Sequence, residues 1–214
     1  MDTLVGITPE RFYEGMTIAQ FVGQMSKNRE IFEENYNSFQ LKPDDAEFLH
    51  GLGRGLKALV LAEDWCGDVV RYLPAFARMA EEAREWEVRV FCRDENSDLA
   101  DMWRKEGKYR SIPVIVFFDE QWEEIGCYVE KPAAVYNADT SARQAFIAHN
   151  PDLPDAQLPA GEMSEATLAR YSEFIREFRI EHRRQWQQLF VDEIRSKLGK
   201  ALSGTRDQGS GVRA

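Results

Sequence analysis

The chain has 214 residues, of which 43% are hydrophobic and 30% are charged, and its formal net charge is −10. This composition is typical of a globular protein with a sizeable buried core. The acidic balance repels phosphates and anionic lipids, so we expect neither nucleic-acid nor membrane partners.

The beginning of the chain has no basic stretch followed by a long apolar run, and no window is apolar enough for a membrane span. The three cysteines, Cys66, Cys92 and Cys127, lie far apart in the sequence. Their spacing matches neither a disulfide framework nor a zinc site, which indicates reduced thiols. We therefore expect a cytoplasmic protein without a bound metal or cofactor.

Residues 1–56 predict a helical N-terminal extension. Apolar side chains recur every three or four positions from Ile18 to Phe39, as on one face of a helix. Pro43 and the two acids after it predict the start of another short helix. The glycines of residues 51–55 end that helix.

Residues 57–155 predict an α/β domain. Short apolar runs indicate strands at 57–62, 88–92, 114–118 and 124–129. Helical patterns cover 66–84, where Pro74 predicts a kink, and 133–149. A further helix is expected to begin at Asp94 or Asn96 and to end at Gly107. Crossover helices make the first strands parallel, and the short turn at 119–122 makes the last pair antiparallel.

Residues 156–203 predict a long C-terminal helix that opens near Ser164. Its apolar stripe needs cover from the N-terminal helices or from a second subunit, so a homodimer through the helical extensions is one expectation. Residues 204–214 are polar and rich in glycine, which is typical of a disordered tail.

Two motifs carry the chemistry. Trp65-Cys66-Gly67-Asp68 stands where a buried strand passes into a helix, and Ile112-Pro113 opens a later strand. A helix N-terminus presents unpaired N–H groups and a partial positive charge, which stabilise a thiolate. An X-Pro bond can be cis at modest cost.

With these motifs the chain resembles the thioredoxin superfamily, over residues 57–148. It is most similar to a bacterial branch with an EDWCGD segment, here 63–68, and an RDEN segment, here 93–96. The resemblance implies a thioredoxin-like fold, which is a central mixed sheet of four to five strands flanked by helices. It also implies that a cis Pro113 faces Cys66 and that Ile112 offers a backbone edge to a ligand.

The resemblance assigns a role to each motif residue. Cys66 is the nucleophile, and Gly67 and Asp68 supply the amides of the helix N-terminus. Trp65 shields one side of the sulfur, while Arg93 belongs to the binding residues and offsets nearby negative charge.

The chain departs from dithiol members of the family at Val69, where they carry a second cysteine. A mixed disulfide at Cys66 therefore has no adjacent resolving thiol. Acidic neighbours, Glu63 and Asp64 among them, raise a thiol pKa, whereas Arg71 and Arg93 lower it.

The leading hypothesis is a thioredoxin-like thiol protein that forms mixed disulfides through Cys66 with a protein or a small-molecule thiol. Whether it is an enzyme stays open, since such an oxidoreductase would lack the resolving cysteine. The alternative is a non-catalytic interaction or dimerisation module on the same fold. A true disulfide reductase would require Cys92 or Cys127 within bridging distance of Cys66.

Overall fold

The computed structural model describes residues 7–52 and 55–203, and the structural statements below refer to these residues. The predicted disordered tail at 204–214 and residues 53–54 of the predicted glycine loop lie outside them. The chain forms two compact units, one of residues 1–131 with 190–214 and one of residues 132–189. Each unit is described by itself.

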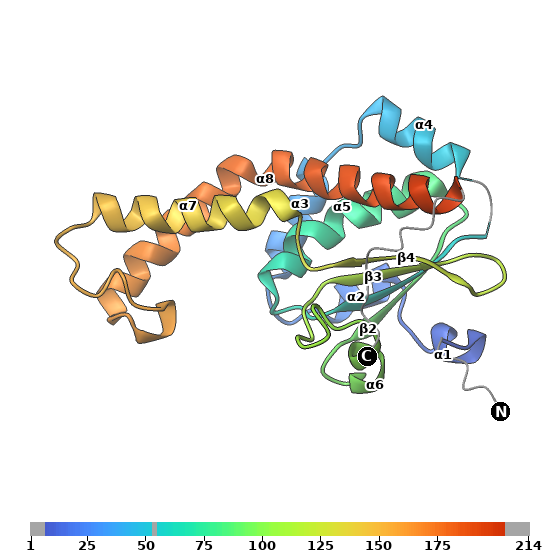
Figure 1. Ribbon diagram of the computed structural model, residues 1–214, viewed down its shortest axis with the longest axis horizontal. Helices are drawn as coiled ribbons and strands as arrows, with labels where there is room; N and C mark the ends of the chain where they lie inside the picture. The colour runs from blue at the N-terminus through green and yellow to red at the C-terminus, as the bar shows by residue number, and fades with distance from the viewer. Residues whose placement is uncertain (1–6, 53–54, 204–214) are drawn as a thin grey trace. The chain divides into compact units, whose positions relative to one another are not determined.

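A four-stranded mixed sheet forms the centre of the first unit (Figure 1). The strand order is β2-β1-β3-β4, with bounds Glu87–Cys92, Lys57–Ala62, Val114–Phe118 and Glu124–Val129. β1 runs parallel to β2 and antiparallel to β3, and β3 pairs antiparallel with β4. Every residue of β1 and β3 is buried, as their unbroken apolar runs predict. The expected mixed sheet with flanking helices is confirmed.

Four short helices precede the sheet: α1 (Pro9–Tyr13), α2 (Ile18–Gln24), α3 (Arg29–Ser38) and α4 (Pro43–Gly51). Thr8 caps α1, and Thr17 forms a capping box with Gln20 at the start of α2. Between these helices, Met16 exchanges two backbone hydrogen bonds with Val90. This bridge covers part of the outer edge of β2, which is otherwise an edge strand.

Helix α5 (Gly67–Ala83) connects β1 to β2 and continues through Pro74. Proline has no N–H, so the carbonyl of Val70, four residues earlier, loses its normal partner in the helix. The buried side chain of Asn35 in α3 donates a hydrogen bond of 2.7 Å to that carbonyl. α3 thus satisfies a backbone group that α5 cannot satisfy itself.

Helix α6 (Ser97–Met102) ends five residues before Gly107, so the predicted end of this helix was wrong. Gly107 has a φ of +66° and follows Glu106, whose φ is +54°. These two residues form the tip of a tight turn instead, with Lys105 and Tyr109 bonded across it. Glycine adopts the left-handed conformation easily, and both helix ends and tight turns use it. In this chain Gly107 belongs to a tight turn.

Figure 1 shows α5 on one side of the sheet and α1 and α6 on the other. The guanidinium of Arg11 in α1 binds Asn96 and Asp98 at the start of α6, which links the two helices. On the α5 side, Phe190 of α8 (Glu165–Leu202) packs against the rings of Tyr72 and Tyr128.

The second unit is a helical hairpin made of α7 (Ala133–His149), the short 3-10 helix η1 (Ala160–Glu162) and the first part of α8. Rings of Phe146, Tyr171 and Phe174 pack between the two long helices. Asp155 accepts hydrogen bonds from the backbone of Ser164 and the hydroxyl of Thr167, which fixes the start of α8. None of the helices described is both long and apolar enough to cross a membrane.

Candidate functional site

Cys66 is the N-cap residue of α5, and its side chain is half-buried. The thiol donates to the carbonyl oxygen of Ile112, with 3.6 Å between Sγ and the oxygen. The peptide bond between Ile112 and Pro113 is cis. The structure therefore brings together the two motifs that are 46 residues apart in the sequence.

Burial raises the pKa of the Cys66 thiol above its ordinary value. The backbone amides of Val69 and Asp68 oppose this rise in pKa, as expected at a helix N-terminus, and the positive charge of Arg93 also opposes it. The Asp68 carboxylate adds to the rise. The two amides that act on the sulfur belong to Asp68 and Val69, and the expected contribution of Gly67 is not among these influences.

Arg93 connects the two sides of the site. Its guanidinium lies 5.0 Å from the centre of the Trp65 ring and donates to the carbonyl of Arg110 at 3.0 Å. It also forms an ion pair with Asp94. Trp65 itself is 44% exposed, so the indole presents most of its outer face to solvent beside the thiol. Arg93 thus braces both the Trp65 loop and the segment that leads to Ile112.

The acids before the cysteine are held by backbone donors. One carboxylate oxygen of Asp64 accepts from the amides of Ser26 and Lys27 and from the Ser26 hydroxyl, at 2.8 to 3.0 Å. These bonds lower the pKa of Asp64 against the opposing effect of its burial. Glu63 accepts a 2.8 Å hydrogen bond from the amide of Asp94. The EDWCGD segment is therefore tied both to the α2–α3 connection and to the RDEN segment.

Sequence reasoning treated Glu63 and Asp64 only as charges near the thiol and did not find Ser26 and Lys27. The available signal was a polar turn before α3, where Asn28 adopts a φ of +55° and donates to the Asp64 carbonyl. Asparagine tolerates this left-handed conformation better than most residues.

Asp68 forms an ion pair of 2.9 Å with Arg71, one turn further along α5. Arg71 is buried, with 7% of its surface exposed, so this pair is well shielded from solvent. The ion pair therefore holds the Asp68 carboxylate in place at the start of α5.

The other two cysteines are free thiols, as is Cys66. Cys92 is half-buried, and burial together with the charge of Glu63 raises its pKa to about 11. Its sulfur accepts a hydrogen bond of 3.6 Å from the Gln24 side chain. Burial also raises the pKa of Cys127 far above its ordinary value. Both thiols are therefore protonated near neutral pH.

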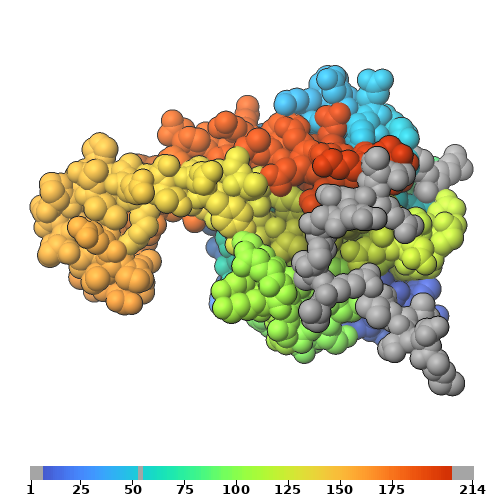
Figure 2. Space-filling model, in the orientation of Figure 1, coloured from blue at the N-terminus to red at the C-terminus, as the bar shows by residue number. Residues whose placement is uncertain are grey.

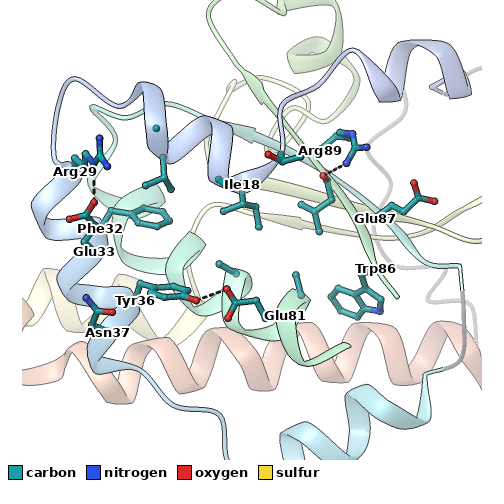
Figure 3. Close-up of a pocket in the computed structure, with 17 residues that line it drawn as sticks. Ile18, Arg29, Phe32, Glu33, Tyr36, Asn37, Glu81, Trp86, Glu87 and Arg89 are labelled. Atoms are coloured by element: carbon teal, nitrogen blue, oxygen red, sulfur yellow. Dashed lines mark hydrogen bonds and ion pairs between the residues drawn. The ribbon is translucent and has the colours of Figure 1, made fainter. Parts of the chain in front are cut away.

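A groove of about 710 Å³ lies between α2, α3, the second half of α5 and the edge strand β2 (Figure 3). Its walls are mainly apolar, with Ile18, Phe32 and Trp86 among them. At its rim Tyr36 and Glu81 point toward each other and form a hydrogen bond. Neither Cys66 nor Ile112 lines this groove, so it is separate from the thiol site.

Among residues 7–52 and 55–203, no three His, Cys, Asp or Glu side chains come close enough to hold a metal ion.

Comparisons with known proteins agree with this fold. A solved structure of a protein of unknown function from Pseudomonas aeruginosa superposes with a TM-score of 0.56 at 21% identity, covering 80% of this chain and 98% of the other. A structure of an HIV epitope scaffold gives a TM-score of 0.59 at 17% identity, with 90% and 98% covered. A search of curated proteins gave no match. A family model described as thioredoxin matches residues 15–143. The chain belongs to the thioredoxin family.

Proposed function

We propose that this protein attacks a partner disulfide through Cys66 and holds the resulting mixed disulfide for a long time. The observation that carries the proposal is the half-buried thiol at the start of α5, within 3.6 Å of the Ile112 carbonyl. By resemblance to thioredoxins, the backbone around Ile112 is the edge along which a partner peptide lies. Val69, in place of a second cysteine, leaves the chain without an adjacent resolving thiol.

The reaction is a thiol–disulfide exchange with a partner disulfide, which is the oxidant. The Cys66 thiolate attacks one sulfur, the partner S–S bond breaks, and the other sulfur leaves as a thiolate that takes up a proton. The product is a Cys66–partner disulfide. An external thiol must then release it.

The raised pKa of Cys66 favours a mixed disulfide that persists over one that an external thiol quickly releases. A thiol of high pKa is a poor leaving group, so an attack that must expel Cys66 from the mixed disulfide is slow. The same thiolate is a strong nucleophile once it has lost its proton. These two properties suit a protein that retains its partner.

The test is the pH dependence of alkylation at Cys66, followed by peptide mapping. We expect the rate to rise through a pKa above the value of about 8.5 for a free cysteine. The sign follows from burial, which disfavours the thiolate, so Cys66 reacts slowly near neutral pH and faster as the pH increases.

The same protein is then treated with a small disulfide, with Cys66→Ser as the control. A mixed disulfide at Cys66 that outlasts the one formed by free cysteine supports the proposal. If Cys66 forms no mixed disulfide even at alkaline pH, thiol chemistry is excluded and the fold acts only as a scaffold.

Two substitutions beside the sulfur should move its pKa in opposite directions. Asp68→Asn removes a carboxylate that raises the Cys66 pKa, so we expect alkylation near neutral pH to become about threefold faster. Arg93→Gln removes a cation that stabilises the Cys66 thiolate, so alkylation of Cys66 near neutral pH should become slower by a similar factor. The readout is the pH profile, and Glu10→Gln, an exposed change in α1, is the matched control. Shifts of the same sign for both variants would contradict this electrostatic account.

A further inference from the structure

The segment between α6 and β3 forms a short hairpin that carries four of the chain's basic residues (Figure 1). We call residues 104–110 the basic arm; it holds one acid, Glu106, and four cations, so its formal charge is +3, the cations being Arg104, Lys105, Lys108 and Arg110. Lys105 and Tyr109 exchange backbone hydrogen bonds of 2.8 and 2.9 Å, and the tip turns at Glu106 and Gly107. The arm is thus a preformed turn whose backbone is internally bonded.

The basic arm is fixed to the rest of its unit at both ends. At its start, Trp103 donates to Glu124 at 3.1 Å, and Lys105 pairs with Glu130 at 2.5 Å, both on the β4 side. At its end, the carbonyl of Arg110 accepts from Arg93. Ile112, whose carbonyl lies 3.6 Å from the Cys66 sulfur, is only two residues further on.

The charge of the basic arm contrasts with that of the whole chain, which is −10. Arg104 and Arg110 share the single carboxylate of Asp101. Lys108 is exposed, and its ammonium lies over the Tyr109 ring at 4.9 Å. Within the part of the chain that the structure describes, Lys108 pairs with no carboxylate. The arm therefore retains positive charge at the exposed Lys108. Figure 2 shows the space-filling model coloured by residue number, in which the green surface belongs to the middle of the chain.

Three acids near the sulfur already have partners, which weakens their effect on this positive charge, although Asp68 still raises the pKa of Cys66. Asp68 pairs with Arg71, Asp94 pairs with Arg93, and Asp64 accepts from backbone amides. An acidic partner at Cys66 therefore has the cations of the arm within a few residues of Ile112, whose carbonyl lies 3.6 Å from the sulfur.

Two exposed aromatic side chains flank the same site. Trp65 is 44% exposed and Tyr109 is 49% exposed, and both stand beside a cation. Exposed tryptophan, tyrosine and arginine are the residues that most often dominate binding energy in protein interfaces. Trp65 adjoins Cys66 in the chain and Tyr109 lies three residues before Ile112, so both suit a peptide partner larger than a simple thiol.

We propose that the partner of Cys66 is a protein segment whose cysteine is flanked by acidic residues, which the basic arm recognises. This inference rests on the proposed mixed-disulfide function and names its substrate class. The acidic side chains contact Lys108 and Arg110, while the partner backbone lies along Ile112. The partner disulfide is the oxidant, as in the reaction above.

The test uses short cysteine peptides activated as 2-pyridyl disulfides, in acidic, neutral and basic versions. The Cys66 thiolate attacks the peptide sulfur, the S–S bond to the pyridyl group breaks, and released thiopyridone is measured. We expect the acidic peptide to react about fivefold faster than the basic one at low salt, with the ratio approaching one at high salt.

Lys108→Gln and Arg110→Gln should each reduce this ratio. Lys197→Gln, an exposed lysine on α8, is the matched control and should leave the ratio unchanged. A ratio of one or less in the unmodified protein overturns the inference. So does an equal reduction by Lys197→Gln, which would indicate a general effect of net charge.

A second measurement separates docking from chemistry. Unactivated acidic and basic peptides are titrated into Cys66→Ser protein, and binding is followed by fluorescence anisotropy. Tighter binding of the acidic peptide that is lost in Lys108→Gln supports recognition by the arm, even if Cys66 reacts with no peptide and the proposed function fails. If Cys66 reacts with the acidic, neutral and basic peptides at equal rates, the proposed mixed-disulfide function is supported. Recognition of acidic segments by the basic arm is then excluded.

Discussion

Arg195→Met is expected to lower the free energy of unfolding by about 3 kcal/mol, the largest effect of any single change considered. The guanidinium of Arg195 in α8 forms an ion pair with Asp45 in α4, whose side chain is completely buried. It also lies 5.1 Å from the Phe48 ring. Removing the guanidinium breaks an ion pair with a buried carboxylate, which costs far more than breaking an exposed pair.

Urea unfolding measures this loss as a lower midpoint with an unchanged slope. Asp45→Asn in the same chain should restore part of the stability, because position 45 then carries no charge, while the amide oxygen can still accept from the Lys42 backbone. The matched control is Arg176→Met, which removes an exposed ion pair with Glu173 on the same helix and should change stability by less than about 0.5 kcal/mol. Equal losses for the two arginines would contradict the argument from burial.

This ion pair illustrates what the sequence could not predict. Asp45 was recognised as an acid in the first turn of a helix, which is correct, but its partner lies 150 residues away. Nothing in the spacing of either residue points to the other. Contacts of this kind depend on how whole helices pack.

The strands were far easier to predict. Unbroken apolar runs define β1 and β3, and Pro113 and the turn at Asp119 mark where β3 begins and ends. The last strand and α7 also have the predicted bounds. Local pattern decides these elements, because burial on both faces and turn residues leave direct traces in the sequence.

The site was predicted in part. The motif around Cys66 and the Ile112-Pro113 pair could be joined only through the resemblance to thioredoxins, since no periodicity links residues so far apart. The hydrogen bonds from Ser26 and Lys27 to Asp64 were not predicted. Their donors are mainly backbone amides, which do not depend on the residue type. Side chains that bind backbone leave little signature in a single sequence.

Asn35→Leu should lower the free energy of unfolding by about 2 kcal/mol, because it leaves the Val70 carbonyl without a donor inside the protein. The cause is Pro74, which deletes the amide that would bind this carbonyl in an ordinary helix. The effect should therefore depend on Pro74. With Pro74→Ala, the new amide can reach Val70, and Asn35→Leu should cost about 1 kcal/mol less.

The double-mutant cycle, measured by urea unfolding, isolates this coupling from the general cost of changing a buried side chain. Asn37→Leu, an exposed change in the same helix, is the matched control and should alter stability by less than about 0.5 kcal/mol. If Asn35→Leu costs the same with and without Pro74, the hydrogen bond does not replace the missing helix bond. If Asn35→Leu costs less in the Pro74→Ala background, α3 holds the first turns of α5 in place. Those turns begin at Cys66, so the N-terminal helices would then belong to the framework that presents the thiol.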